Sequence, residues 1–480
     1  MAIRDFRDFI AVSEQQGLLR RVRKSIDPSW EAACLAKWAF QGLPNDQRFG
    51  LLFEDVEGSD FSLATGVLGA SAQTYALALG VAPEEINDTW MTALLNPVKP
   101  KPVKSAVCQE VVLQGEEADV TKLPIPTWTP GKDAAPYITT ITVTRNTDGV
   151  QNMGVYRTMV RGPRDVVCNL NPGRHGFMQA STWLDQGKPA PIAWVIGTEP
   201  AVHLATVANM PFGSDEVEIA GGLKGEPVEM VKCMTSDIMV PANSEIIIEG
   251  EVLPGEKATE GPFGEMVGYV GAVGQKPVVR ITAITHRNNA IYYGLTSQMP
   301  PSESTVLQSL TQAAVTLKTI RHDLGETAVS DVHVDLHFGG ILGHGIVSMT
   351  PRHPGHAKKV GRLIANFGPL KRITVVDDDI DIRDPMHVDW AMNARYMPHR
   401  DTDIIDDCYI RSSMDPALGS GDTRLPFGSK LVIDATQSVA EGEFSLPPKD
   451  LMEKALGSWK DAGLPAFDVP RRVKLRLEKS

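Results

Sequence analysis

Short segments rich in valine, isoleucine and threonine recur through the middle of this chain and limit what it can fold into. They include ITTITVT at 138–144, EIIIEGEV at 245–252 and VVRITAITH at 278–286. Glycine and proline separate the segments, which is the pattern of strands joined by turns. Residues 138–286 are therefore predicted to form a β-sheet or β-barrel domain.

Mixed helical and strand patterns flank this region. Phe6, Phe9, Ile10 and Ser13 fall on one face of a short helix that Gly17 can end, and a strand is predicted at 18–22. Proline-rich runs at 98–104 and 123–131 cannot be regular helix, so the first domain boundary is expected between them.

The C-terminal third combines helices with strands. Apolar residues at helical spacing predict a helix over 303–320, and strands are predicted at 332–336, 346–349 and 372–376, with a helix over 355–367. This order predicts a βαβ-like unit and therefore an α/β fold. The last ten residues, RRVKLRLEKS, are expected to form a solvated tail or a subunit contact.

Length and charge narrow the class of protein. A chain of 480 residues with 42% hydrophobic and 22% charged residues is expected to fold into two to four globular domains. Its net charge of −12 disfavours nucleic acid as a partner but allows a small anionic substrate in a locally basic cleft.

Cysteine usage and hydropathy indicate the compartment. The five cysteines form no CxxC pair, which is typical of reduced intracellular thiols. No stretch approaches the roughly 20 apolar residues of a membrane span. We therefore expect a cytoplasmic protein and no membrane partner.

Three scattered polar residues are candidate metal ligands. Asn152 lies in the strand-rich region, His175 follows the turn at 171–173, and Glu218 comes after MPFG at 210–213. An amide oxygen, an imidazole and a carboxylate together suit Mn²⁺ or Mg²⁺. Hydrogen-bonded structural groups are the alternative interpretation, because no local spacing defines the site.

Two carboxylates, Glu260 and Glu265, flank a turn rich in glycine and proline that can aim both into one cavity. If burial and a salt bridge separate their pKa values, the two can act as an acid/base pair. An exposed acidic turn is the alternative.

Other motifs are less specific. Lys358 lies near the start of a predicted helix, where backbone N–H groups favour a phosphate, but a solvated basic first turn is the more ordinary interpretation. Asp377, Asp378 and Asp379 end a predicted strand and are more typical of caps or turns than of a metal site. No GxSxG, Walker or HExxH motif supports a hydrolase or kinase.

Taken together and in order, these segments resemble one family. The segments are NMGVYR, RH, MPFGSDEVEIAGGLKGEPVEMVK, EGPFGE, PGHAKKVG, DDDID and VDWAMNAR. They resemble the UbiD family of prenylated-FMN-dependent decarboxylases from the N-terminus to about Pro448. The resemblance implies an α+β and α/β multidomain fold with a central split β-barrel that binds the flavin. The expected segments are an N-terminal α/β domain at 1–110, the barrel at 111–310, a C-terminal α/β oligomerisation domain at 311–450 and a helix or tail at 451–480.

The resemblance also implies the cofactors. Asn152, His175 and Glu218 would bind Mn²⁺, which holds the phosphate of prenylated FMN, often beside K⁺. Lys358, or its neighbour Lys359, would contact that phosphate. The residues expected to line the flavin are Val155, Tyr156, Arg157, Arg174, Met210 and Pro211.

For the reaction, the resemblance implies a network of Arg157, Glu260 and Glu265 beside the substrate. Arg157 would pair with Glu260, and Glu265 would deliver the proton that replaces CO2 on an aromatic, heteroaromatic or α,β-unsaturated acid. The same residues would serve the reverse carboxylation. A flavin prenyltransferase would supply the cofactor, and a homodimer or homohexamer is expected. A flavin-independent metalloenzyme and a non-catalytic subunit of a multi-subunit carboxylase are the competing hypotheses.

Overall fold

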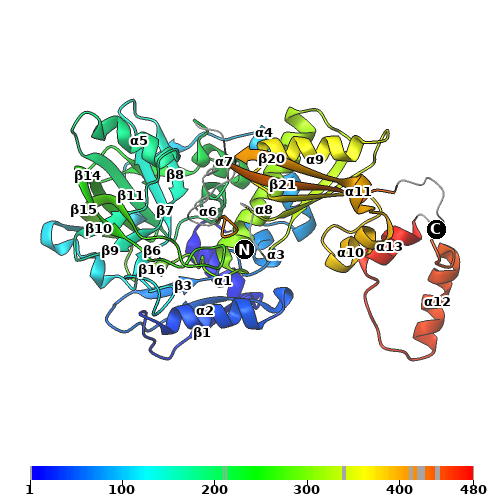
Figure 1. Ribbon diagram of the computed structural model, residues 1–480. Coiled ribbons are helices and arrows are strands. Elements are labelled where there is room, and N and C mark those ends of the chain that lie inside the picture. Colours follow the sequence, from blue (N-terminus) through cyan, green and yellow to red (C-terminus); the bar gives the residue numbers. More distant parts are fainter. Residues whose placement is uncertain are drawn as a thin grey trace. The chain divides into compact units, whose positions relative to one another are not determined.

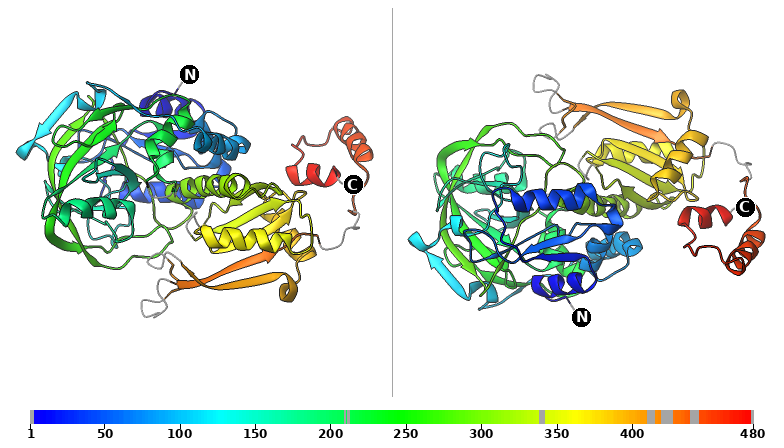
Figure 2. Two further views of the ribbon diagram at one scale, coloured as in Figure 1. Left: turned by 90° about the horizontal axis from the view of Figure 1, so that it is seen from above. Right: turned by 90° about the horizontal axis from the view of Figure 1, so that it is seen from below.

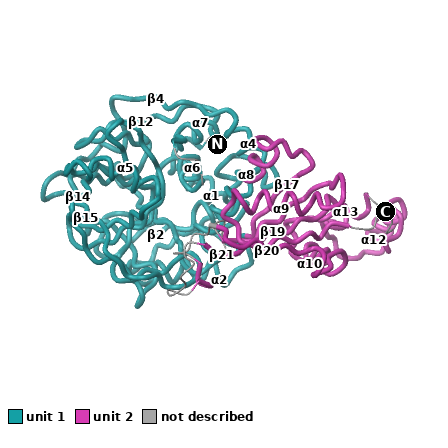
Figure 3. The backbone as a smooth tube through the Cα atoms, turned by 45° about the horizontal axis from the view of Figure 1, so that its top comes forward, with its two compact units in different colours: residues 1–315, 336–339 teal, residues 316–335, 340–480 magenta. Residues whose placement is uncertain are grey.

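The computed structural model describes residues 3–208, 210, 213–337, 342–409, 415–418, 427–437 and 444–478. The chain forms two compact units (Figure 3). Unit 1 comprises residues 1–315 and 336–339, and unit 2 comprises residues 316–335 and 340–480. No helix within the described ranges is both long and apolar enough to cross a membrane. The four segments expected from the sequence divide the chain more finely, and their boundaries stay predictions.

A curled antiparallel sheet forms one side of unit 1 (Figures 1 and 2). Its described strands follow the order β6-β9-β10-β15-β14-β11-β7-β8, and β5 pairs with β15. The strands are β5 (Val111–Gln114), β6 (Tyr137–Ile138), β7 (Ile141–Arg145), β8 (Gln151–Val155), β9 (Thr158–Val160), β10 (Asp165–Cys168), β11 (Ala190–Ile196), β14 (Ile246–Glu260) and β15 (Gly274–His286).

The two long strands β14 and β15 give this sheet its curvature. They pair antiparallel with Ile248 opposite Ile284, and the register shifts after Glu249 and again after Val252. Such irregularities bend a strand and increase its twist. The half-barrel confirms both the strand-rich prediction for 138–286 and the expected mixed multidomain fold class.

A second sheet in unit 1 has the order β1-β2-β3-β16. Its strands are β1 (Leu19–Val22), β2 (Gly50–Phe53), β3 (Ser62–Thr65) and β16 (Ile291–Tyr293), accompanied by helices α1 (Phe6–Gln15), α2 (Glu31–Gly42), α3 (Ala72–Leu79) and α4 (Ile86–Leu95). β16 follows the curled sheet in sequence yet pairs in parallel with β3. The chain therefore returns from the barrel to the N-terminal layer.

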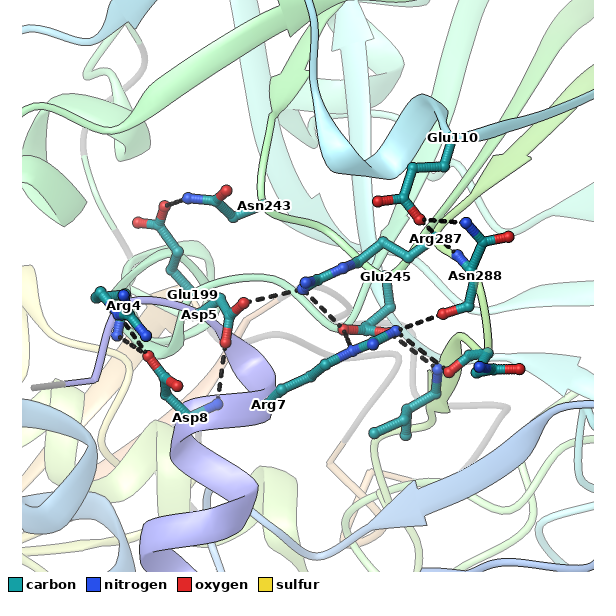
Figure 4. Close-up of polar contacts among 12 residues, drawn as sticks. Arg4, Asp5, Arg7, Asp8, Glu110, Glu199, Asn243, Glu245, Arg287 and Asn288 are labelled. Atoms are coloured by element: carbon teal, nitrogen blue, oxygen red, sulfur yellow. Dashed lines mark hydrogen bonds and ion pairs between the residues drawn. The ribbon is translucent and has the colours of Figure 1, made fainter. Parts of the chain in front are cut away.

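Helix α1 agrees with the sequence pattern. Asp5 caps it by accepting a hydrogen bond from the Asp8 N–H at 2.9 Å, and Phe6 and Phe9 are buried. An ionic network then ties α1 to the barrel (Figure 4). The buried Glu245 carboxylate accepts two hydrogen bonds from Arg7, both at 2.8 Å, and one from Arg287 at 3.2 Å. A buried carboxylate is tolerated only with such partners.

Shorter elements complete unit 1. A small sheet joins β4 (Lys101–Pro102), β12 (Glu229–Lys232) and β13 (Met239–Pro241). Helix α5 (His175–Leu184) packs on β7, β8 and β11, and α7 (Glu216–Lys224) packs on α4 and on α6 (Pro200–Thr206). Helix α8 (Glu303–Lys318), which the sequence predicts over 303–320, crosses the boundary between the units.

Unit 2 is an α/β fold, as the sequence predicts. Its sheet has the order β17-β18-β19-β21-β20, in which β18, β19 and β21 are parallel. The strands are β17 (Val329–Val334), β18 (His344–Met349), β19 (Arg372–Asp377), β20 (Thr402–Tyr409) and β21 (Phe427–Asp434), and the helices are α9 (His356–Phe367), α10 (Pro385–Ala394), α11 (Pro398–Asp401), α12 (Lys449–Asp461) and α13 (Arg471–Leu477).

The acidic run after β19 is structural. Arg395 contacts Asp377 at 2.8 Å and Asp379 at 2.6 Å through its guanidinium nitrogens. The C-terminal residues, expected to form a helix or a tail, include α13, whose Arg476 lies 4.4 Å from the centre of the Trp390 ring. Both contacts stabilise the end of unit 2.

Candidate active site

Arg157 lies between two carboxylates at one end of the curled sheet. It follows β8, while Glu260 is the last residue of β14 and Glu265 lies in the turn before β15. The guanidinium donates two hydrogen bonds to Glu260, at 2.8 and 3.0 Å, and a third to Glu265. The Glu260 side chain is fully buried, whereas the side chains of Arg157 and Glu265 are 13% and 17% exposed. The turn is therefore not an exposed acidic turn.

Two aromatic residues, Phe263 and Tyr137, lie against this cluster and its turn. The Arg157 guanidinium carbon lies 5.1 Å from the centre of the Phe263 ring, a cation–π arrangement. The Tyr137 hydroxyl accepts a hydrogen bond from the Gly261 N–H at 3.2 Å and donates to the Pro262 carbonyl at 3.3 Å. Burial raises the pKa of Tyr137, so its hydroxyl stays protonated.

Asp133 fixes the turn that carries Glu265. One oxygen of its carboxylate accepts the Gly264 N–H at 2.8 Å, and the other accepts the Thr129 N–H at 2.7 Å. The Ala134 N–H also donates to the Pro262 carbonyl at 3.0 Å. Burial raises the pKa of Asp133, while the hydrogen bonds from the Gly264 and Thr129 N–H groups oppose the shift. The segment at 129–137 thus holds the turn at 261–265.

The two carboxylates have different environments. Glu260 makes a bidentate pair with Arg157 out of contact with water, which fixes the orientation of the guanidinium. Glu265 shares only one nitrogen of the same guanidinium and keeps access to solvent. Glu265 is therefore the more accessible of the two carboxylates.

The predicted metal ligands all lie in unit 1. Asn152 is buried in β8, His175 is the first residue of α5, and Glu218 is half-buried in α7. No group of three or more His, Cys, Asp or Glu side chains in the described part of the chain is arranged to hold a metal. The predicted set contains only two residues of these four types, because its third member is Asn152. The metal site therefore stays a prediction.

Asn152 has spare hydrogen-bonding capacity. Its side chain bonds the Tyr156 hydroxyl, yet its Nδ2 is buried and has no hydrogen-bond partner among the described residues. Such a buried polar atom needs an explanation, and a bound group is one. Because the oxygen and nitrogen of an amide exchange places by a half-turn, this side chain fits a metal ligand or a cofactor contact.

Glu216 is a second carboxylate near Asn152 that the sequence interpretation did not single out. It is buried, and its Oε2 accepts the N–H of Met153, the residue after Asn152, at 3.1 Å. Burial raises the pKa of Glu216 to about 7. The sequence offered one signal, Asp215, a residue type that commonly caps a helix, and it caps α7 here. A helix that starts after Asp215 has Glu216 and Glu218 as its first and third residues, which lie on nearly opposite faces. The contact with Met153 directs the Glu216 side chain toward β8.

Two of the residues expected to line a flavin, Tyr156 and Arg174, lie where β8 meets α5. The Tyr156 hydroxyl accepts the Gly176 N–H at 3.0 Å, and a Cβ atom added to Gly176 would lie 2.9 Å from the Tyr156 ring. Arg174 precedes α5, Val155 is exposed and Met210 is half-buried. Pro211 lies outside the described residues. The start of α5 offers N–H groups that suit a phosphate.

Lys358 lies in unit 2, in the first turn of α9. Its Nζ donates to the Arg400 carbonyl and lies 3.5 Å from the Asp403 carboxylate, while the side chain of Lys359 is exposed. The phosphate contact expected for one of these lysines stays a prediction.

The chain combines a half-barrel sheet with α/β layers, and three domains of one family of carboxy-lyases match it in order. The 3-octaprenyl-4-hydroxybenzoate carboxy-lyase N-terminal domain matches residues 10–94, its Rift-related domain matches 101–300 and its C-terminal domain matches 305–435. This chain belongs to the UbiD family.

Solved structures of the same class cover nearly the whole chain. An evolved dimeric form of the UbiD-class enzyme HmfF from Pelotomaculum thermopropionicum, in complex with prFMN, is 36% identical, with 93% of this chain and 98% of that chain covered and a TM-score of 0.80. Vanillic acid decarboxylase from Sedimentibacter hydroxybenzoicus is 29% identical over 95% and 99%, with a TM-score of 0.83. Apo 3,4-dihydroxybenzoic acid decarboxylase from Enterobacter cloacae is 25% identical over 95% and 100%, with a TM-score of 0.82.

Proposed function

We propose that this protein decarboxylates an aromatic, heteroaromatic or α,β-unsaturated carboxylic acid with prenylated FMN, and that Glu265 is the proton donor. The observation that carries the proposal is Arg157 held between a buried Glu260 and a partly exposed Glu265, in a chain of the UbiD family. The similar structures are a prFMN complex and decarboxylases of aromatic acids, which supports the cofactor and the substrate class.

The cofactor would be held at the junction of β8 and α5. Asn152 and His175 are proposed to hold Mn²⁺ together with a glutamate of α7, with K⁺ nearby. Glu216 is favoured over Glu218 as that glutamate, because its buried carboxylate contacts β8 beside Asn152. Prenylated FMN, when bound, supplies an electron sink for the charge left by departing CO2.

The chain's own residues have separate tasks in the reaction. Glu260 holds the Arg157 guanidinium in one orientation through two hydrogen bonds. Arg157 then offers its remaining donor capacity to the substrate carboxylate and to Glu265. Glu265 delivers a proton to the carbon that loses CO2, and water regenerates its acid form. In the reverse direction Glu265 would accept that proton.

Partners follow from the same chemistry. A flavin prenyltransferase would supply the cofactor, and CO2 would be the common product. We expect a cytoplasmic enzyme that assembles as a homodimer or homohexamer.

The test is to co-express the protein with a flavin prenyltransferase and record the absorbance and mass spectra of the bound small molecule. We expect prenylated FMN, bound manganese and CO2 release from one or more acids in an aromatic and cinnamic panel. Folded, metal-loaded protein that binds no flavin would favour the metalloenzyme hypothesis. Flavin-loaded protein that releases no CO2 from any acid would favour the non-catalytic subunit.

A further inference from the structure

The side chain of Lys276 on β15 lies beside the buried Glu260 on β14. Gly274 is opposite Glu260 in the register of the two strands, and Lys276 is opposite Ala258. Opposite residues of an antiparallel pair share one face of the sheet, so Lys276 and Glu260 are diagonal neighbours on one face. A Cβ atom added to Gly274 would lie 3.7 Å from Lys276 Cε. The lysine chain therefore leans over Gly274, the residue opposite Glu260.

Charge also links Lys276 to the active-site cluster. Burial lowers the pKa of the Lys276 amine, the negative charge of Glu260 opposes that shift, and the positive charge of Arg157 adds to it. Both Glu260 oxygens accept hydrogen bonds from Arg157. The Lys276 amine donates instead to the side-chain oxygen of Asn171. Lys276 is thus a further cation beside the buried ion pair, bonded to a different segment of the chain.

That segment is the connection from β10 to α5. Its first residue, Asn169, donates its N–H to the Arg157 carbonyl at 3.0 Å. Asn171 then opens a turn, because its carbonyl accepts the Arg174 N–H at 3.1 Å, and α5 begins at the next residue. The connection is therefore held at its start by the backbone of Arg157 and at its turn by the side chain of Lys276.

The turn sets the position of Arg174. Burial raises the pKa of Tyr156, and the positive charge of Arg174 opposes that shift, so the two side chains are neighbours. The Tyr156 hydroxyl in turn accepts the Gly176 N–H at 3.0 Å. This is the junction of β8 and α5 at which the cofactor would be held. The bond between Lys276 and Asn171 therefore acts on one wall of that junction.

We propose that Lys276 is a positioning residue for the flavin site. Through its bond to Asn171 it fixes the turn before α5, and with it Arg174, relative to the buried ion pair of the active site. The proposal rests on the function proposed above, because it requires a flavin at the junction of β8 and α5. A charged donor suits this task, because its hydrogen bond is stronger than that of a neutral one. Small displacements of bound reactants are costly to catalysis, so a fixed turn is an advantage.

Hydrogen exchange tests whether the bond holds the turn. Lys276→Met and Asn171→Ala remove the bond from opposite ends, so one folded variant of the two is enough. Lys257→Met is the matched control, because Lys257 is exposed on the other face of the same strand pair. We expect exchange in peptides covering 169–178 to be about tenfold faster without the bond, the effect of losing one hydrogen bond to a charged group. Exchange as slow as in wild type and Lys257→Met would overturn the proposal.

Titration with FMN in the presence of Mn²⁺, followed by flavin fluorescence, tests the positioning role. Lys276→Met should weaken FMN binding about tenfold, whereas Lys276→Arg keeps a charged donor and should stay close to wild type. Adding Asn171→Ala to Lys276→Met should weaken binding no further, because both changes remove the same bond. Faster exchange with unchanged FMN affinity would make Lys276 a purely structural contact and overturn its positioning role.

The proposed function and this inference fail separately. CO2 release from an acid of the panel, with an FMN affinity that does not depend on Lys276, would overturn the inference alone. An FMN affinity that depends on Lys276, without CO2 release from any acid, would overturn the proposed function alone. A wild type that binds no flavin would overturn both.

Discussion

The Arg157 guanidinium donates two hydrogen bonds to Glu260, at 2.8 and 3.0 Å, and the Glu260 side chain is fully shielded from water. An ion pair in that position is strongly coupled, because removing one partner leaves the other charge buried. Glu260 is thus both a structural element of the turn and the residue that orients Arg157.

Glu260→Gln removes this charge and keeps the shape of the side chain. We expect the free energy of unfolding to fall by about 3 kcal/mol, the lower end for a broken buried pair, because Arg157 keeps its contact with Glu265. Urea denaturation measures the change. Glu251→Gln, an exposed position on the same strand, is the control and should be close to neutral. Equal stability of the two variants would contradict a coupled buried pair.

Glu265→Gln tests the proton donor. The amide occupies the same volume and retains a contact with Arg157, so we expect flavin and metal to stay bound. Turnover should fall at least a hundredfold, because the acid group is lost. CO2 release and deuterium incorporation at the product carbon measure the effect. Glu256→Gln, on an exposed part of β14, should retain activity. Near-normal turnover in Glu265→Gln would move the donor role to another group.

A matched pair of variants on α7 distinguishes the two glutamates that are candidate metal ligands. Glu216 is buried against β8, and Glu218, two residues on, lies on nearly the opposite face. We expect Glu216→Gln and His175→Ala to lose manganese and, with it, flavin. Elemental analysis and flavin absorbance of the purified proteins measure both. Loss of metal in Glu218→Gln, with retention in Glu216→Gln, would restore Glu218 as the ligand.

Local sequence patterns predicted much of the fold. The valine- and isoleucine-rich segments become β14 and β15, and Phe6 and Phe9 form the buried face of α1. The pairing of β16 with β3 was not predictable, because it joins segments more than 200 residues apart. No periodicity within a segment carries that information.

The candidate site shows the same limit. The cluster of Arg157, Glu260 and Glu265 was expected from family resemblance, and its catalytic roles stay predictions. The sequence did not single out Glu216, because Glu216 and Glu218 are two residues apart on α7 and the rotation of the helix decides which carboxylate faces β8.

A buried histidine gives a prediction on acid stability. His203 lies in unit 1, where its Nε2 accepts the Thr198 N–H at 3.2 Å and its ring packs edge-on against Tyr293 at 4.9 Å. Burial lowers the pKa of His203 from 6.5 to about 3. Below pH 6.5 the imidazole therefore binds a proton in the unfolded chain but not in the folded chain. The free energy of unfolding is at its full value above that pH and declines as the pH falls toward 3.

By pH 4 this single group should reduce the free energy of unfolding by about 3 kcal/mol relative to pH 7. His203→Gln keeps a hydrogen-bond acceptor for Thr198 and cannot titrate, so its stability should depend less on pH by that amount. Urea denaturation of both proteins between pH 4 and 7 measures the difference. His399→Gln, at an exposed position, is the surface control and should follow the wild-type profile. Parallel pH profiles for wild type and His203→Gln would show that the imidazole becomes protonated inside the folded protein, with water admitted to its site.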